Sequence, residues 1–182
     1  MADVTENGLR AAVKALTDIV APAINHSDPL AIEQLRLVVD YLEFVRRRLD
    51  FLHDRDRFEL EHNLGMARAL DHLGAPGSAR TSTLLQSAIQ AGAKAQVRPE
   101  ATSPALKSAA ATLAAAVREL IREAADFDAP IRCQVERCVL DATDQRITFD
   151  RAWYLPLGFD PAAGEVSALV DLLAPHGGRD HL

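Results

Sequence analysis

Apolar side chains recur at every third or fourth position through most of the chain, with charged residues between them. This spacing places the apolar residues on one face of a helix and the charged residues on the other. The longest such stretch runs from Leu30 to Leu73 without a proline, and its only glycine is Gly65. The pattern predicts an all-α protein in which this stretch forms a long second helix.

Capping residues mark both ends of the long helix. Asp28 can accept hydrogen bonds from the free amides of the first turn, and Pro29 takes a position where a missing N–H costs nothing. Gly74 and Pro76 favour a stop at the other end. A straight helix over the whole stretch would be about 65 Å long. A compact domain of 182 residues cannot fully cover such a helix.

A charged patch from His53 to Arg57 leaves two interpretations of the middle of this stretch. Asp56 followed by Glu59 is typical of a capping box and would begin a separate helix. The apolar stripe nevertheless keeps its phase through the patch, because five residues on both sides of it fall within roughly 60° of one another. These residues are Leu42, Leu49, Leu60, Leu64 and Ala67. We therefore expect one continuous or gently kinked helix.

Five further helices follow from the same pattern. They are expected over residues 5–24, over residues 81–96, from Ser103-Pro104 onward, from Pro130 to about Tyr154, and after a cap at Asp160-Pro161. We expect a six-helix bundle around the long second helix, with mostly antiparallel packing. The prediction is a single domain over residues 1–174 and a flexible tail over residues 175–182.

Composition and charge narrow the class of protein. Aromatic residues make up only 5 % of the chain, which favours helix over strand. A net charge of −6 argues against a nucleic-acid partner, since such proteins carry a basic surface. No segment approaches the about 18 uninterrupted apolar residues of a membrane span. Cys133 and Cys138 would diverge by about 140° on a helix. Reduced thiols in a cytoplasmic protein are therefore expected.

Several polar residues share the face of the long helix that carries the leucines. His53, Asp56 and Asn63 lie on it, with Glu59 nearby, and a buried unpaired polar group costs about 1–3 kcal/mol. One interpretation is an exposed stripe or a satisfied polar layer that fixes helix register. The other is a ligand pocket in which Asp56 orients His53 as a general acid or base.

Trp153 and Tyr154 are the remaining candidates for a binding site. An aromatic pair at the end of a helix usually caps a core, and less often it forms the wall of an apolar pocket or a docking surface. No motif in the chain specifies a cofactor, and none is expected.

Two short motifs suggest a metal but are incomplete. Glu59 and His62 have the Glu-x-x-His spacing of di-iron bundles, which need two such motifs. His62 should also lie nearly opposite His53, on the solvent side. His53-Asp54, with His26 upstream, resembles the histidine set of HD-domain phosphohydrolases. A helix of about 35 Å would separate His26 from His53, so we do not assign the chain to that family and expect no metal.

Two functions remain open. The first is an interaction or accessory module, acting as a homodimer or with a helical protein partner, because part of the long helix should stay uncovered. The second is a small-molecule-binding protein or enzyme with a polar pocket between helices near His53, Asp56 and Asn63.

Overall fold

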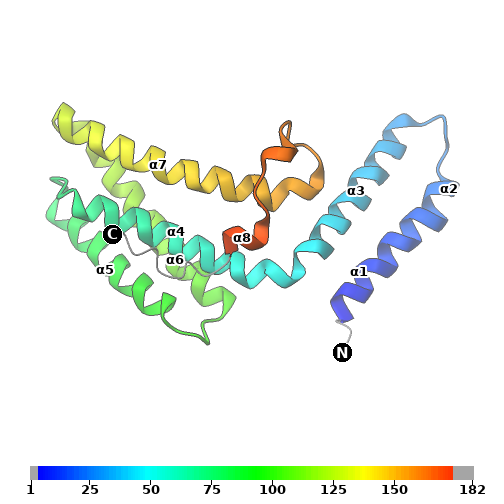
Figure 1. The fold of residues 1–182 in the computed structure, drawn as a ribbon, viewed down its shortest axis with the longest axis horizontal. Coiled ribbons are helices and arrows are strands. Elements are labelled where there is room, and N and C mark those ends of the chain that lie inside the picture. Colours follow the sequence, from blue (N-terminus) through cyan, green and yellow to red (C-terminus); the bar gives the residue numbers. More distant parts are fainter. Residues whose placement is uncertain (1–3, 174–182) are drawn as a thin grey trace. The chain divides into compact units, whose positions relative to one another are not determined.

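The structure, a computed structural model, describes residues 4–173. Every regular element in this range is helical and no strand occurs in it, which confirms the predicted all-α fold (Figure 1). Contacts divide the chain into two compact units. The hairpin unit comprises Met1–Leu52 and Arg151–Val166, and the bundle unit comprises His53–Asp150 and Ser167–Leu182. The single domain over residues 1–174 stays a prediction, and the predicted tail, residues 175–182, lies outside the described residues.

The hairpin unit begins with the first predicted helix, which is helical in three segments. These are α1 (Val4–Ala15), a π-helical turn (Leu16–Val20) and α2 (Ala21–Ala23). The amide of Ala21 donates to the carbonyl oxygen of Leu16, the wider spacing of a π turn. Pro22 follows directly, and its missing N–H interrupts the α-helical ladder.

Helix α3 (Pro29–Arg48) starts at the predicted cap. Asp28 Oδ1 accepts hydrogen bonds from the amides of Leu30 and Ala31, each at 3.1 Å. α1 and α3 pack against each other as an antiparallel hairpin (Figure 1), and Glu6 of α1 lies 3.3 Å from Arg46 of α3. Neither helix encloses much of its apolar stripe, because Phe44 is their only buried residue.

The long second helix is confirmed, with one irregular turn. α3 passes through a 3-10 turn (Leu49–Phe51) into α4 (Leu52–His72), which gives 44 helical residues. The charged patch lies inside α4, so no separate helix begins at Asp56.

The bundle unit is built on α4, α5 (Ala79–Gln96) and α6 (Ser103–Glu123). α5 and α6 lie close together at Gly92. A Cβ added to this glycine would lie only 2.7 Å from Leu113 Cδ1. Leucines and alanines of the three helices form one buried core. α7 (Ala129–Tyr154) contributes Val135 to it. α6 contributes the centre of the core, with Leu106, Leu113 and Leu120 at most 3 % exposed.

The last predicted helix begins later than expected. Asp160 accepts a hydrogen bond from the Ala162 amide at 2.9 Å, but Arg151 also binds its carboxylate at 2.8 Å and 3.0 Å. The segment after it forms a turn and a short 3-10 helix (Ala163–Glu165), and α8 covers only Leu169–Leu173. A helix start at Asp160-Pro161 is therefore wrong. Within residues 4–173, no helix has the length and apolar composition needed to cross a membrane.

Candidate functional site

His53 is held in the bundle unit by its neighbours. Its Nδ1 lies 3.4 Å from Ser103 Oγ at the start of α6, and Arg57 Nε donates to its Nε2 at 3.1 Å. Arg57 Nη2 also donates to the carbonyl oxygens of Arg98 and Pro99, at 3.3 Å and 3.1 Å. These two residues lie in the loop between α5 and α6. His53 and Arg57 therefore tie α4 to that loop and to the first turn of α6.

Asp56 is the one charged residue that is buried among the residues described. Its Oδ2 lies 3.7 Å from Lys107 Nζ on α6, and the Lys107 side chain is 68 % exposed. A pair with one exposed partner is weakened by solvent and contributes little stability. Asp56 thus faces α6, on the same side of α4 as His53.

The two remaining predicted residues of α4 have other partners. Glu59 forms an ion pair with Arg146 on α7, and Arg146 Nε donates to Asp150 Oδ2 at 2.9 Å. Asn63 Nδ2 donates to the carbonyl oxygen of Glu59 at 2.9 Å, within its own helix. The four polar residues predicted on α4 therefore point to α6, to α7 and to their own backbone, and they do not line one common space.

Trp153 and Tyr154 belong to the hairpin unit. Phe44 packs edge-on against Trp153 at 6.4 Å between ring centroids and stacks on Tyr154 at 5.7 Å. Arg48 lies 5.5 Å over the Trp153 ring and donates to the carbonyl oxygens of Ala152 and Trp153 at 3.0 Å and 2.9 Å. The pair thus caps a small core at the end of α7. A ligand-binding role for the six candidates stays a prediction.

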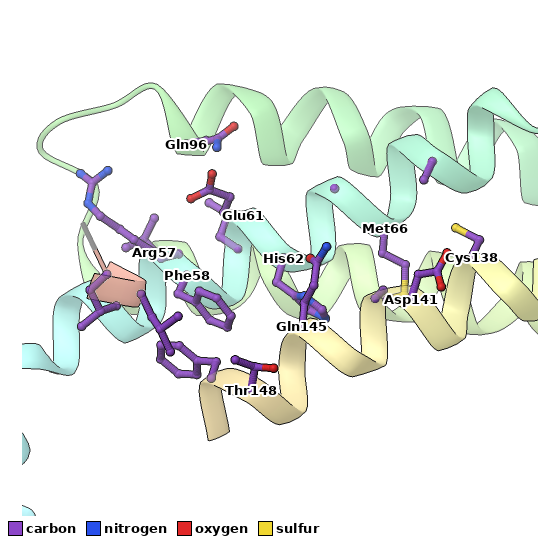
Figure 2. Close-up of a pocket in the computed structure, with 18 of the residues that line it drawn as sticks. Arg57, Phe58, Glu61, His62, Met66, Gln96, Cys138, Asp141, Gln145 and Thr148 are labelled. Carbon is purple, nitrogen blue, oxygen red and sulfur yellow. The ribbon is translucent and has the colours of Figure 1, made fainter. Parts of the chain in front are cut away.

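A large groove runs between α4 and α7 in the bundle unit. Its volume is about 1350 Å³, and we call it the α4–α7 groove. α4 and the residue after it line the groove from Asp54 to Leu73, α7 lines it from Gln134 to Phe149, and Leu172 and Leu173 lie at its border. Figure 2 shows side chains of both helices directed across it, among them Met66 from α4 and Asp141 from α7.

The groove exists because the facing positions are small or polar in its middle. α4 presents Gly65 and Ala69, and α7 presents Asp141 and Ala142. No atom lies within 4 Å of a Cβ built on Gly65, so the space beside it is open. α7 is held to the bundle at both sides of this stretch, by Val135 in the core and by Phe149, which stacks on Phe58 at 3.7 Å. Within the interval, His62, Met66 and Gln145 line the groove without closing it.

Two titratable groups of the groove have shifted pKa values. His62 stacks on Phe58 at 6.0 Å, and burial lowers the pKa of His62, as does the nearby Arg146 guanidinium. Burial also raises the pKa of the Cys138 thiol, with a contribution from the Asp141 carboxylate. At neutral pH the histidine is neutral and the thiol protonated. Across the described residues, no group of three His, Cys, Asp or Glu side chains could hold a metal.

The sequence pattern did not predict the α4–α7 groove. His62 was expected on the solvent side, and that expectation is wrong, because the residue is half-buried on the face covered by α7. A usable signal was present in α4, where Phe58, Met66 and Leu73 form a second apolar stripe opposite Leu60 and Leu64. Two stripes on one helix predict packing partners on both sides.

Fold and groove together define an all-helical protein with an open groove between two antiparallel helices. No family model, curated protein or solved structure matches the chain. The proposals below therefore derive from its own residues.

Proposed function

We propose that the protein is a helical interaction module that self-associates through its N-terminal hairpin. The observation that carries the proposal is an uncovered apolar stripe on α3. Leu30, Val38 and Tyr41 are 68 %, 47 % and 59 % exposed. With the half-buried Leu37 and Val45, they fall within about 100° of the helix circumference. Exposed Gln34 lies between Leu30 and the other four residues. An exposed apolar stripe of this kind is typical of a protein–protein interface.

The hairpin unit has only a small core of its own. Among described residues, Phe44, Ala152 and Trp153 are the only buried apolar side chains of the hairpin unit. The stripe of α1 is also incompletely covered, with Leu9 and Val13 half-buried. Two antiparallel helices that bury so little gain most from a second helical pair, and two hairpins make a four-helix bundle.

A second copy of the chain is the partner that this surface fits. A two-fold symmetric dimer brings the same apolar stripe to both sides of the interface. A face two helices wide and about 30 Å long covers roughly 600 Å², close to the about 800 Å² that each partner buries in a standard interface. A small-molecule site at His53, Asp56 and Asn63 has less support, since these residues already have partners within the bundle.

Sedimentation analysis of the purified chain tests the proposal. We expect a species of twice the chain mass of 19.8 kDa at micromolar concentration. The double variant Val38→Glu/Tyr41→Glu should sediment as a monomer with its helical content retained, because two charges would be buried in the interface.

The matched control places the same charges on exposed leucines of the bundle unit. Leu84 and Leu140 are 43 % and 68 % exposed, and Leu84→Glu/Leu140→Glu should leave the dimer intact. A monomeric wild-type protein, or equal dissociation of both double variants, would overturn the proposal.

A further inference from the structure

We infer that the α4–α7 groove binds an amphipathic helix of a protein partner, one with large apolar residues on one face and basic residues flanking them. This site is separate from the α3 stripe, so the inference does not rest on the proposed dimer. Three properties of the groove carry it: its dimensions, the residues at its border and the charges on its rim.

The dimensions of the groove fit a helix. It follows α4 from Asp54 to Leu73, a length of nearly 30 Å at 1.5 Å per residue. A helix of this length and about 10 Å in diameter occupies roughly 2,200 Å³. The observed 1350 Å³ therefore corresponds to somewhat more than half of this volume. Sites for small molecules are typically about 300–1,000 Å³ and more enclosed.

The chain itself already places helical leucines at the groove. Leu172 and Leu173, at the end of α8, line its border, and Leu169 of the same short helix is buried. The groove surface thus accepts aliphatic side chains presented by a helix, which is the recognition mode of helix-in-groove complexes. α8 is only five residues long and leaves most of the groove uncovered.

Acidic side chains outnumber basic ones on the rim, which favours a basic partner. Asp54, Glu61 and Asp141 line the groove, and Arg57 and Arg137 line it with them. None of the three forms an ion pair with another described residue. Arg57 is engaged by His53 and by two carbonyl oxygens. The carboxylates are therefore available to lysines or arginines beside the apolar anchors of a bound helix, an arrangement that favours encounter and fixes orientation.

The inference is tested with a model peptide whose binding is followed by fluorescence anisotropy. The probe is a fluorescein-labelled leucine–lysine peptide of about 18 residues, some 27 Å long as a helix, with its leucines on one helical face. The comparison peptide has the same composition, with leucine and lysine alternating so that no helical stripe forms. Saturable binding of the first peptide, and at least about tenfold weaker binding of the second, is expected.

Two variants locate the binding site. Gly65→Phe fills the middle of the groove and should weaken binding at least about tenfold. Gly8→Phe is the matched control, because Gly8 is also a helical glycine with open space beside it and lies on α1, which contributes no residue to the groove. Glu61→Lys/Asp141→Lys should weaken binding at low salt, with a smaller effect at high salt, and it decides the question if Gly65→Phe does not fold.

Four outcomes would overturn the inference. The first is no binding of the helical peptide, and the second is equal binding to the wild type and to both groove variants. The third is a wild-type protein that is dimeric and a Gly65→Phe variant that is monomeric, which would make a second copy of the chain the occupant. The fourth is organic extraction of a lipid from the wild type but not from Gly65→Phe, which would make the occupant an acyl chain.

Discussion

Single polar side chains hold segments of the bundle unit together. Arg57 joins α4 to the loop before α6 through two carbonyl oxygens. Glu123, at the end of α6, joins that end to the start of α5. Its carboxylate accepts hydrogen bonds from the Ser78 amide and hydroxyl at 2.7 Å and 2.8 Å, and from the Thr81 hydroxyl at 2.6 Å.

Glu123 should make the stability of the protein depend on pH. The Thr81 hydroxyl and the Ser78 amide and hydroxyl lower the pKa of Glu123 below its usual 4.5. A depressed pKa adds stability above the unfolded-state pKa, and this stability is lost as the pH falls through the folded-state value. Glu123→Gln should therefore lower the melting temperature at pH 7, and the difference from the wild type should vanish in acid.

The control for this prediction is Glu119→Gln, one turn earlier on α6. Glu119 pairs with Arg122 at the surface, and an exposed pair of this kind contributes little. Thermal unfolding followed by circular dichroism at neutral and acidic pH measures both variants. An equal loss for the two glutamines at pH 7 would contradict a special role of Glu123.

At the level of the elements, two glycines on neighbouring helices should respond in opposite ways to alanine. Gly65→Ala on α4 meets open space and should stabilise the protein by about 0.5–1 kcal/mol through helix propensity. Gly92→Ala on α5 brings a Cβ to 2.7 Å from the fully buried Leu113. The resulting overpacking costs about 1–3 kcal/mol and should exceed the propensity gain.

Urea denaturation of the two alanine variants, each against the wild type, measures this contrast. A destabilised Gly65→Ala would mean that the space beside α4 is filled in solution. An unchanged or more stable Gly92→Ala would mean that α5 and α6 are not packed as closely as the Gly92 contact implies.

The elements were largely predictable because their signals are local. The Asp28-Pro29 cap, the Ser103-Pro104 start and the 3.6-residue periodicity each act within a few residues of sequence. The groove was not predictable in the same way, because α4 was expected to have one buried face and one solvent face. The second apolar stripe becomes meaningful only once α7 lies against it.

The polar candidates show the same limit of a sequence-based argument. Asp56 was expected on a packing face and is buried there, so the phase of the helix was informative. Its partner Lys107 lies fifty-one positions away in the sequence, on α6. The start of α8 was missed because Arg151, nine positions earlier, also binds the carboxylate of Asp160, which otherwise has the features of a helix cap.

At the scale of the whole molecule, the two units differ greatly in the size of their cores. The hairpin unit has three buried apolar side chains among its described residues, and the bundle unit has seventeen. Because burial of apolar surface is the main source of stability, the hairpin unit should be the weaker one. Self-association would add to its stability with rising concentration.

Unfolding in urea should therefore occur in two resolvable steps. Trp153, the only tryptophan of the chain, is buried in the hairpin unit. Its emission should shift to the red at lower urea than the loss of the helical circular dichroism signal, and its midpoint should rise with protein concentration. Coincident transitions without concentration dependence would indicate a single cooperative structure instead.

The position of the two thiols on α7 makes the groove chemically addressable. Cys133 is exposed to solvent, whereas Cys138 faces the groove and is partly covered by the core. An alkylating reagent should therefore react faster with the exposed Cys133 than with the partly covered Cys138, although both lie on α7. The natural chain thus contains both a probe of access to this surface and its internal reference.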